Sequence, residues 1–235
     1  MPTTTLAQLA DRAQNALNDS GAGTWSQTLV QEWVLEAVRE YSIHFPRIQI
    51  ADMDCSTGAH EYDLPADYSA MLTVEYPLGQ DPPQYLKRKD HRDPLFWLSD
   101  DYYDVPQIPG EIAPEGKDVA PAQLYISAQV STGETIRITY HAHHRLDLEG
   151  SDLLSVPREH EHLLILFVIW KAFTERLATE SQSPDTTMGL LQSLRLLAQR
   201  AQEAYLAALN RALAHARNVG GWTTPWTMDP FDRVY

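Results

Sequence analysis

The order of the hydrophobic patterns along this chain constrains its fold more than any other feature. Residues 5–45 and 157–218 carry apolar residues at helical spacing, whereas residues 47–148 carry short apolar stretches separated by Pro and Gly. Because an amphipathic helix must bury its apolar face, we expect the two helical ends to pack on each other and the strand-rich part to project as an insert. The predicted fold class is α+β, with a helical bundle built from 1–46 and 150–220, a small antiparallel β-sandwich or barrel inserted over 47–149, and an extended C-terminal arm over 221–235.

Two helices are predicted in the first part of the chain, over residues 5–18 and about 26–44. Pro46 ends the second helix, because proline disfavours helical geometry at the residue before it. Two pairs of residues offer capping boxes, in which each side chain satisfies a free backbone amide of the first turn: Thr5 with Gln8, and Thr24 with Gln27.

The middle of the chain is predicted to form short antiparallel strands joined by irregular loops. Residues 131–134 (Ser-Thr-Gly-Glu) suit a hairpin turn that would join the last two strands. The Pro-, Gly- and acid-rich segment 105–121 is predicted to be a long exposed loop. The candidate strands are 60–64, 70–76, 84–89, 123–128 and 135–141.

Two long helices are predicted in the last third of the chain. The first begins at Pro157 and continues to about residue 179, and its apolar run 163–170 marks it as the central, most buried helix. The second spans about 187–218. Its heptad-spaced seam favours packing on the preceding helix over a free coiled coil: Leu191, Leu194, Ala198, Ala201, Tyr205, Ala208 and Ala212.

Charge is strongly negative and unevenly distributed. The net charge is −14, which argues against conventional nucleic-acid binding and against an anionic membrane surface. Residues 47–160 carry 20 acidic residues against 9 Lys and Arg, whereas the last helix carries four arginines and a single acid, Glu203. The asymmetry suits either solvated surfaces or complementary patches between subunits.

The chain shows no sequence motif for catalysis or for a cofactor, so we expect no catalytic residues, no cofactor and no metal site. His141 and His143 are the best candidate metal ligands, because alternate residues of a strand point to the same side. The lone cysteine, Cys55, has no nucleophile context. The apolar run 163–170 is too short to cross a bilayer, so we expect no membrane association.

The final segment is dense in aromatic residues and has no helical period. Such side chains are costly in water and are enriched where proteins meet. The segment either folds back on its own domain or docks on a neighbouring subunit or partner. The predicted interface residues are Trp222, Trp226, Phe231 and Tyr235.

Four stretches together resemble the head-to-tail adaptor (connector) proteins of tailed bacteriophages. Trp25-Ser26 opens a Trp-containing helix that ends near Phe45-Pro46, and Tyr62-Asp-Leu-Pro-Ala-Asp-Tyr68 is similar to the family's strand and turn. The other two stretches are the pair Leu124-Tyr-Ile and Ile136-Arg-Ile-Thr-Tyr140, which resembles the family's closing hairpin, and Leu153-Leu-Ser-Val-Pro157, which leads into a helix.

The resemblance implies a structural virion protein and not an enzyme. It implies a ring of copies, dodecameric in many members, at the neck of the virion, with assembly in the host cytoplasm. The implied partners are further copies of the chain, the portal protein and tail tube or nozzle proteins. Helices of the bundle would line or surround a channel through which double-stranded DNA passes during ejection without being read, and an acidic wall suits that passage.

Two other functions remain open from the sequence. One is another tail-completion or neck component, although such proteins are smaller and mostly β, which the long last helix disfavours. The other is a metal-dependent hydrolase that uses His141, His143 and nearby acidic residues.

Overall fold

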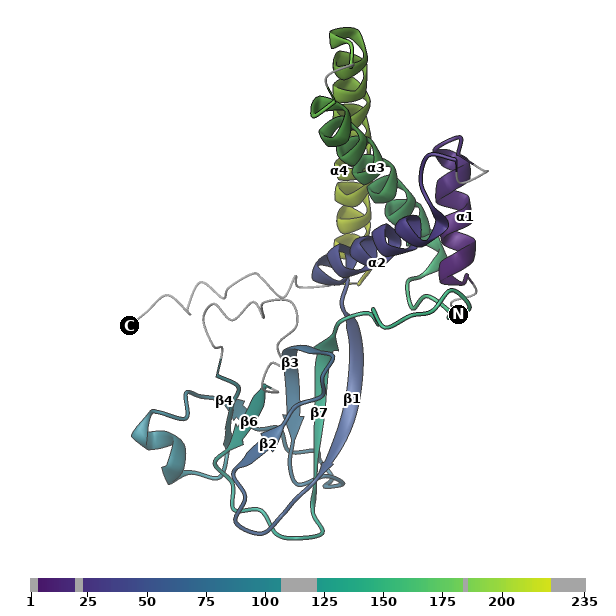
Figure 1. Ribbon diagram of the computed structural model, residues 1–235. Helices are drawn as coiled ribbons and strands as arrows, with labels where there is room; N and C mark the ends of the chain where they lie inside the picture. Colours follow the sequence, from purple (N-terminus) through teal and green to yellow (C-terminus); the bar gives the residue numbers. More distant parts are fainter. Residues whose placement is uncertain (1–3, 20–22, 107–121, 184–185, 221–235) are drawn as a thin grey trace. The chain divides into compact units, whose positions relative to one another are not determined.

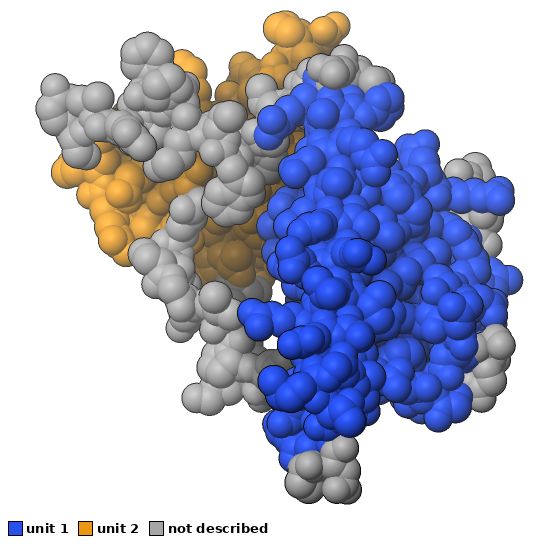
Figure 2. Space-filling model, turned by 90° about the horizontal axis from the view of Figure 1, so that it is seen from above, with its two compact units in different colours: residues 1–45, 144–235 blue, residues 46–143 orange. Residues whose placement is uncertain are grey.

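A computed structural model describes residues 4–19, 23–106, 122–183 and 186–220 (Figure 1). The protein is α+β, as predicted. By its internal contacts the chain divides into two units, which Figure 2 shows in different colours. Unit 1 comprises Met1–Phe45 and His144–Tyr235, and unit 2 comprises Pro46–His143.

Unit 1 is helical, and both ends of the chain contribute to its core. Leu9 and Trp33 from the first part of the chain share one hydrophobic cluster with Leu164 and Ala208 from the last part. The segment between unit 2 and the third helix joins the same cluster through Leu154 and its apolar neighbours. The described helices of unit 1 are α1 (Leu6–Ala16), α2 (Gln27–His44), the short 3-10 helix η2 (Arg158–His160), α3 (Glu161–Ser181) and α4 (Met188–Gly220).

The first of the two predicted capping boxes is confirmed. The Thr5 side chain accepts a hydrogen bond from the Gln8 amide, and the Gln8 side chain accepts one from the Thr5 amide. The second capping box is wrong, because α2 is capped by Ser26, whose Oγ accepts from the Leu29 amide at 3.2 Å. Thr24 cannot serve there, since its own amide donates to the Asp19 carboxylate at 3.0 Å. That carboxylate also accepts from the Trp25 amide, which is the main reason that the pKa of Asp19 is lowered.

Unit 2 consists of two sheets around one hydrophobic cluster. The three-stranded antiparallel sheet has the order β1-β7-β3, and the four-stranded sheet has the order β2-β6-β5-β4. Val74 and Ile138 of the first sheet and Leu124 and Ile126 of the second are fully buried in the shared cluster. The strands are β1 (Arg47–Asp54), β2 (Glu61–Asp63), β3 (Tyr68–Glu75), β4 (Lys87–Arg88), β5 (Tyr102–Asp104), β6 (Gln123–Ile126) and β7 (Thr135–Ala142), with the 3-10 helix η1 (Pro94–Leu98) between β4 and β5.

The predicted hairpin between the last two strands is wrong. The turn at 131–134 is present, with a Glu134 amide to Ser131 carbonyl bond of 3.2 Å and a positive φ at Gly133. Both edges of β6 are already paired, one with β2 and the other with β5, so β6 has no free edge for β7. The chain therefore crosses between the two sheets instead of forming a hairpin.

Strand β1 was not predicted as a strand, although it is one of the longest in unit 2. Its burial alternates along its whole length, and its more buried positions hold Arg47, Gln49, Ala51 and Met53. The isoleucines of the strand occupy the exposed positions. The pattern of burial is regular, but the hydropathy pattern that a strand usually shows is inverted here.

Candidate interaction surfaces

Helix α4 packs on α3 along the predicted seam (Figure 1). The Tyr205 ring stacks on Trp170 with centroids 5.9 Å apart and meets Phe167 edge-on at 5.5 Å. Burial raises the pKa of the Tyr205 hydroxyl to about 12. Five seam residues are buried, namely Leu194, Ala198, Ala201, Tyr205 and Ala208. The expected packing of the last two helices is confirmed.

A second apolar stripe runs along another side of α4, roughly 110° around the helix axis from the seam. A helix turns about 100° per residue, so residues three, four and seven positions apart share a face. By this spacing one face of α4 presents a set of residues that are all exposed, which we call the outer stripe: Leu190, Ser193, Leu196, Leu197, Arg200, Ala204, Ala207 and Arg211.

The outer stripe combines exposed apolar area with positive charge. Leu196 is 54% exposed and Leu197 is 41% exposed, in a helix whose seam is already covered. Within the described part of the chain, no carboxylate lies within ion-pair distance of Arg200 or Arg211. A helix with two apolar sides needs two partners, and α3 covers only one of them.

A second exposed apolar surface lies on the three-stranded sheet of unit 2. Strand register places Ile48 beside His141 and Ile50 beside Thr139 on the face that points away from the core cluster. Ile50 is 64% exposed. Three acidic residues lie on this face, Asp52, Asp54 and Glu75, and Asp52 is bound by Arg137 through two hydrogen bonds of 2.7 and 2.8 Å.

The histidines that the sequence offered as metal ligands do not share a site. His141 lies within β7 and is buried, whereas His143 follows the end of the strand and is exposed. The His141 Nδ1 atom has no hydrogen-bond partner among the described residues, and burial lowers the pKa of this imidazole. The next histidine along the chain, His144, belongs to unit 1.

A third exposed apolar surface is the turn formed by η1. Leu95, Trp97 and Leu98 project outward and are 56%, 48% and 78% exposed. Asp100 and Asp101 follow after Ser99 and are also exposed. We call these five residues the platform.

Buried and capped groups hold the platform in one conformation. Phe96 is fully buried beneath it and meets the Trp97 ring edge-on at 4.8 Å. The Asp93 carboxylate accepts from the Leu95 amide at 2.8 Å, and the Trp97 indole donates to the His91 carbonyl at 3.0 Å. The sequence did not predict this element, because four consecutive apolar residues (95–98) carry no signal for which of them is buried.

Asp90, His91 and Asp104 form a cluster of possible metal ligands next to the platform. The buried Asp104 carboxylate accepts from the His91 backbone amide at 3.0 Å and lies 2.7 Å from its Nδ1 atom. The His91 ring stacks on Tyr125 at 4.4 Å. Both contacts are made to one carboxylate oxygen, Oδ2, and they attach the start of the η1 turn to the sheet. Sequence reasoning missed the cluster, since 13 residues separate its halves.

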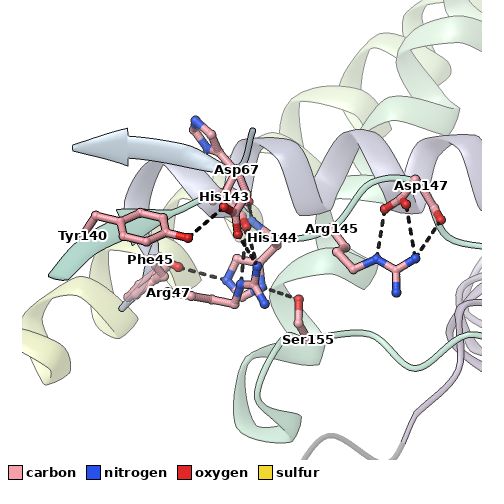
Figure 3. Close-up of polar contacts among 10 residues, drawn as sticks. Phe45, Arg47, Asp67, Tyr140, His143, His144, Arg145, Asp147 and Ser155 are labelled. Atoms are coloured by element: carbon pink, nitrogen blue, oxygen red, sulfur yellow. Dashed lines mark hydrogen bonds and ion pairs between the residues drawn. The ribbon is translucent and has the colours of Figure 1, made fainter. Parts of the chain in front are cut away.

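The chain passes between the two units twice, after Phe45 and after His143. In each unit, polar contacts hold the residues next to these two points (Figure 3). In unit 2, the Arg47 guanidinium donates to the His143 carbonyl at 2.9 Å and pairs with Asp67 at 3.2 Å. In unit 1, the His144 imidazole lies 2.7 Å from the Ser155 hydroxyl and 3.0 Å from the Phe45 carbonyl oxygen. These contacts fix where the chain enters and leaves each unit.

The predicted interface residues Trp222, Trp226, Phe231 and Tyr235 lie outside the described residues, as does most of the predicted loop 105–121. In the described part of the chain, no helix is both long and apolar enough to cross a membrane.

Comparison with known proteins assigns the chain to a family. The model of a family described as SU10 adaptor protein matches residues 4–229, which is nearly the whole chain. A comparison with curated proteins found no match.

Proposed function

Because the chain belongs to the SU10 adaptor protein family, a structural family of phage head-to-tail adaptors, we propose that it assembles into a ring at the neck of the virion, between the portal and the tail. The family match over residues 4–229 carries this proposal. The family makes the chain a virion component of a bacteriophage. The ring, its partners and its channel are the parts that we propose.

The surfaces of the described residues support self-assembly. Exposed leucines on α4, isoleucines on the sheet and the platform give the monomer three apolar patches, more than a chain that works alone needs. The aromatic residues Trp222, Trp226, Phe231 and Tyr235 would add a fourth contact, with a neighbouring copy, the portal protein or a tail tube or nozzle protein.

The charge of the chain supports a channel through which DNA slides. At −14 the chain repels phosphates on average, so a ring of such chains would not retain the DNA that passes through it. Sequence-specific contacts are not expected.

The test is subunit-resolved electron microscopy of purified phage particles. We expect this chain to form a closed ring between portal and tail. Absence of the chain from purified particles, or its location elsewhere in them, would overturn the proposal. A truncated chain that ends at Gly221 tests the role of the arm, and we expect particles that lack tails or lose them.

A further inference from the structure

We propose that the outer stripe of α4 in one copy binds the platform of a second copy. This contact rests on the proposed assembly into a ring and names the surfaces that would join its neighbours. Both surfaces consist of described residues. Each contains exposed apolar side chains beside charged side chains that form no ion pair with another described residue.

The charges of the two surfaces are opposite. Helix α4 carries four arginines and one glutamate, although the whole chain is at −14. The segment Asp90–Asp104 carries five aspartates and one arginine, Arg92. On the platform itself, Asp100 and Asp101 are exposed and make no ion pair with a described residue. Opposite potentials bring two surfaces together and fix their register.

The same charges disfavour the other pairings. Two copies of α4 placed stripe to stripe would bring Arg200 and Arg211 against arginines, and two platforms would bring aspartates together. The exposed sheet face is a weaker partner for the stripe, because Arg137 puts a positive charge on it and already pairs with Asp52, one of its three acidic residues. The platform is therefore the acidic apolar surface that best fits the stripe.

The composition and the rigidity of the platform also favour binding. The platform offers Trp97 between two leucines, and tryptophan is among the residues that dominate binding energy at interfaces. Its buried Phe96 and capped turn fix its conformation before binding, so little conformational entropy is lost on association. On the stripe, Leu196 and Leu197 are adjacent and Arg200 lies one helical turn further on.

The contact is heterologous, since different surfaces of the two copies meet. A heterologous contact leaves one free surface of each kind at the ends of a dimer, so it continues from copy to copy and closes into a ring when the rotation permits. A contact between identical surfaces would stop at two copies. A single repeated interface between stripe and platform is therefore enough to build the ring.

Cysteine cross-linking tests the contact directly. The native thiol, Cys55, is buried and would be replaced by serine in every variant. One chain carries Leu98→Cys on the platform and another carries Leu197→Cys on the stripe, and they are oxidised separately and as a mixture. We expect covalent dimers in the mixture and at least about tenfold less in either chain alone. Dimers of a single variant in equal yield, or no dimer in the mixture, would overturn the inference.

A chain that carries both cysteines tests whether the platform binds the stripe of its own copy instead of a second copy. If the platform bound the stripe of its own chain, this variant would form a cross-linked monomer whose yield does not change on dilution, and that result would contradict the inference. We expect multimers whose yield falls on dilution.

Charge reversal gives an independent test with a matched control. Arg200→Glu lies on the stripe, whereas Arg195→Glu lies on a different side of the same helix and also removes an exposed arginine. We expect the first to lower the yield of cross-linked dimers at least about fivefold and the second to leave it unchanged. Copies with Arg200→Glu mixed with copies carrying Asp100→Arg should recover the yield, because each then meets an opposite charge. Equal effects of the two arginine variants would contradict the inference.

Electron microscopy of the same variants separates this inference from the proposed function. Normal rings built from the Arg200→Glu chain would refute the contact and leave the adaptor function intact. A failure of the unmodified chain to form any ring in particles would refute the proposed function itself.

Discussion

Helices α3 and α4 lie side by side (Figure 1), yet some leucines of α4 are exposed whereas Leu163 and Leu164 of α3 are buried. Helix α3 packs against α1, α2 and α4, and its Leu163 and Leu164 are each 1% exposed. Helix α4 packs on α3 through its seam and leaves Leu196 and Leu197 in water. Helix α3 therefore stabilises the fold of the single chain, whereas α4 also leaves exposed leucines that are available to a partner.

The largest effect is expected from shortening a leucine of α3. Leu164→Ala removes fully buried methyl groups and should lower the free energy of unfolding by about 2–5 kcal/mol. Leu197→Ala on the outer stripe should change it by less than about 0.5 kcal/mol. Denaturant unfolding of both variants, followed by circular dichroism, checks the contrast. Similar losses in the two variants would mean that α4 is as deeply packed as α3.

The charged residues of the two helices should differ in the same way. Glu161 in the first turn of α3 is buried and pairs with Arg12 at 2.5 Å, whereas Arg200 of α4 is exposed and makes no ion pair with a described residue. Arg12→Met leaves a buried carboxylate without its partner and should cost about 1–3 kcal/mol of unfolding free energy. Arg200→Met should cost less than about 0.5 kcal/mol.

An exposed ion pair serves as the control for the loss of the Arg12 pair. Arg145 binds Asp147 at 2.9 Å, but both side chains are largely in water. Arg145→Met should therefore be close to neutral in the same unfolding measurement. An effect as large as that of Arg12→Met would show that burial of Glu161 is not what makes its pair important.

The smallest effect concerns His141, which is buried in the sheet of unit 2 without a partner for Nδ1 among the described residues. Burial lowers its pKa, so the unfolded chain takes up a proton more readily than the folded one. Stability is then greatest above the usual histidine pKa of about 6.5 and falls as the pH drops below it. His160, whose pKa is also lowered by burial, acts in the same direction.

Replacement of His141 checks this reasoning. His141→Leu removes an unsatisfied buried nitrogen and should raise the free energy of unfolding by about 1 kcal/mol, with a smaller loss of stability on acidification. The measurement is the melting temperature at pH 7.5 and pH 5.5. The exposed His143→Leu is the control and should change neither value noticeably. Destabilisation by His141→Leu would show instead that Nδ1 forms a stabilising hydrogen bond in the folded protein.

The sequence predicted best what depends on helical periodicity. The α+β class is confirmed, and so is the packing of α4 on α3, because each follows from apolar residues that recur at a fixed spacing. The prediction that α3 is the most buried helix is wrong, because α1 and α2 bury larger shares of their residues and half of the run 163–170 is only partly buried. The capping box at Thr5 is confirmed because its partners are three residues apart.

The errors arose where long-range pairing decides the structure. Residues 131–134 form a turn as expected, but only the pairing of β6 on both edges shows that no hairpin follows. Strand β1 points its isoleucines outward, so its hydropathy pattern gives the wrong face. The platform could not be predicted, since its conformation depends on Phe96 and on a contact between His91 and Asp104.

Thiol labelling of the free and the assembled protein tests most directly whether the outer stripe of α4 serves assembly. Leu197→Cys lies on the stripe, and Leu206→Cys is an equally exposed leucine on another side of the same helix. The native Cys55 is buried, and burial raises the pKa of its thiol, so it contributes little background. We predict that assembly protects the thiol of Leu197→Cys from a maleimide at least about tenfold and leaves that of Leu206→Cys reactive. Equal reactivity of both thiols in the assembled ring would contradict the account.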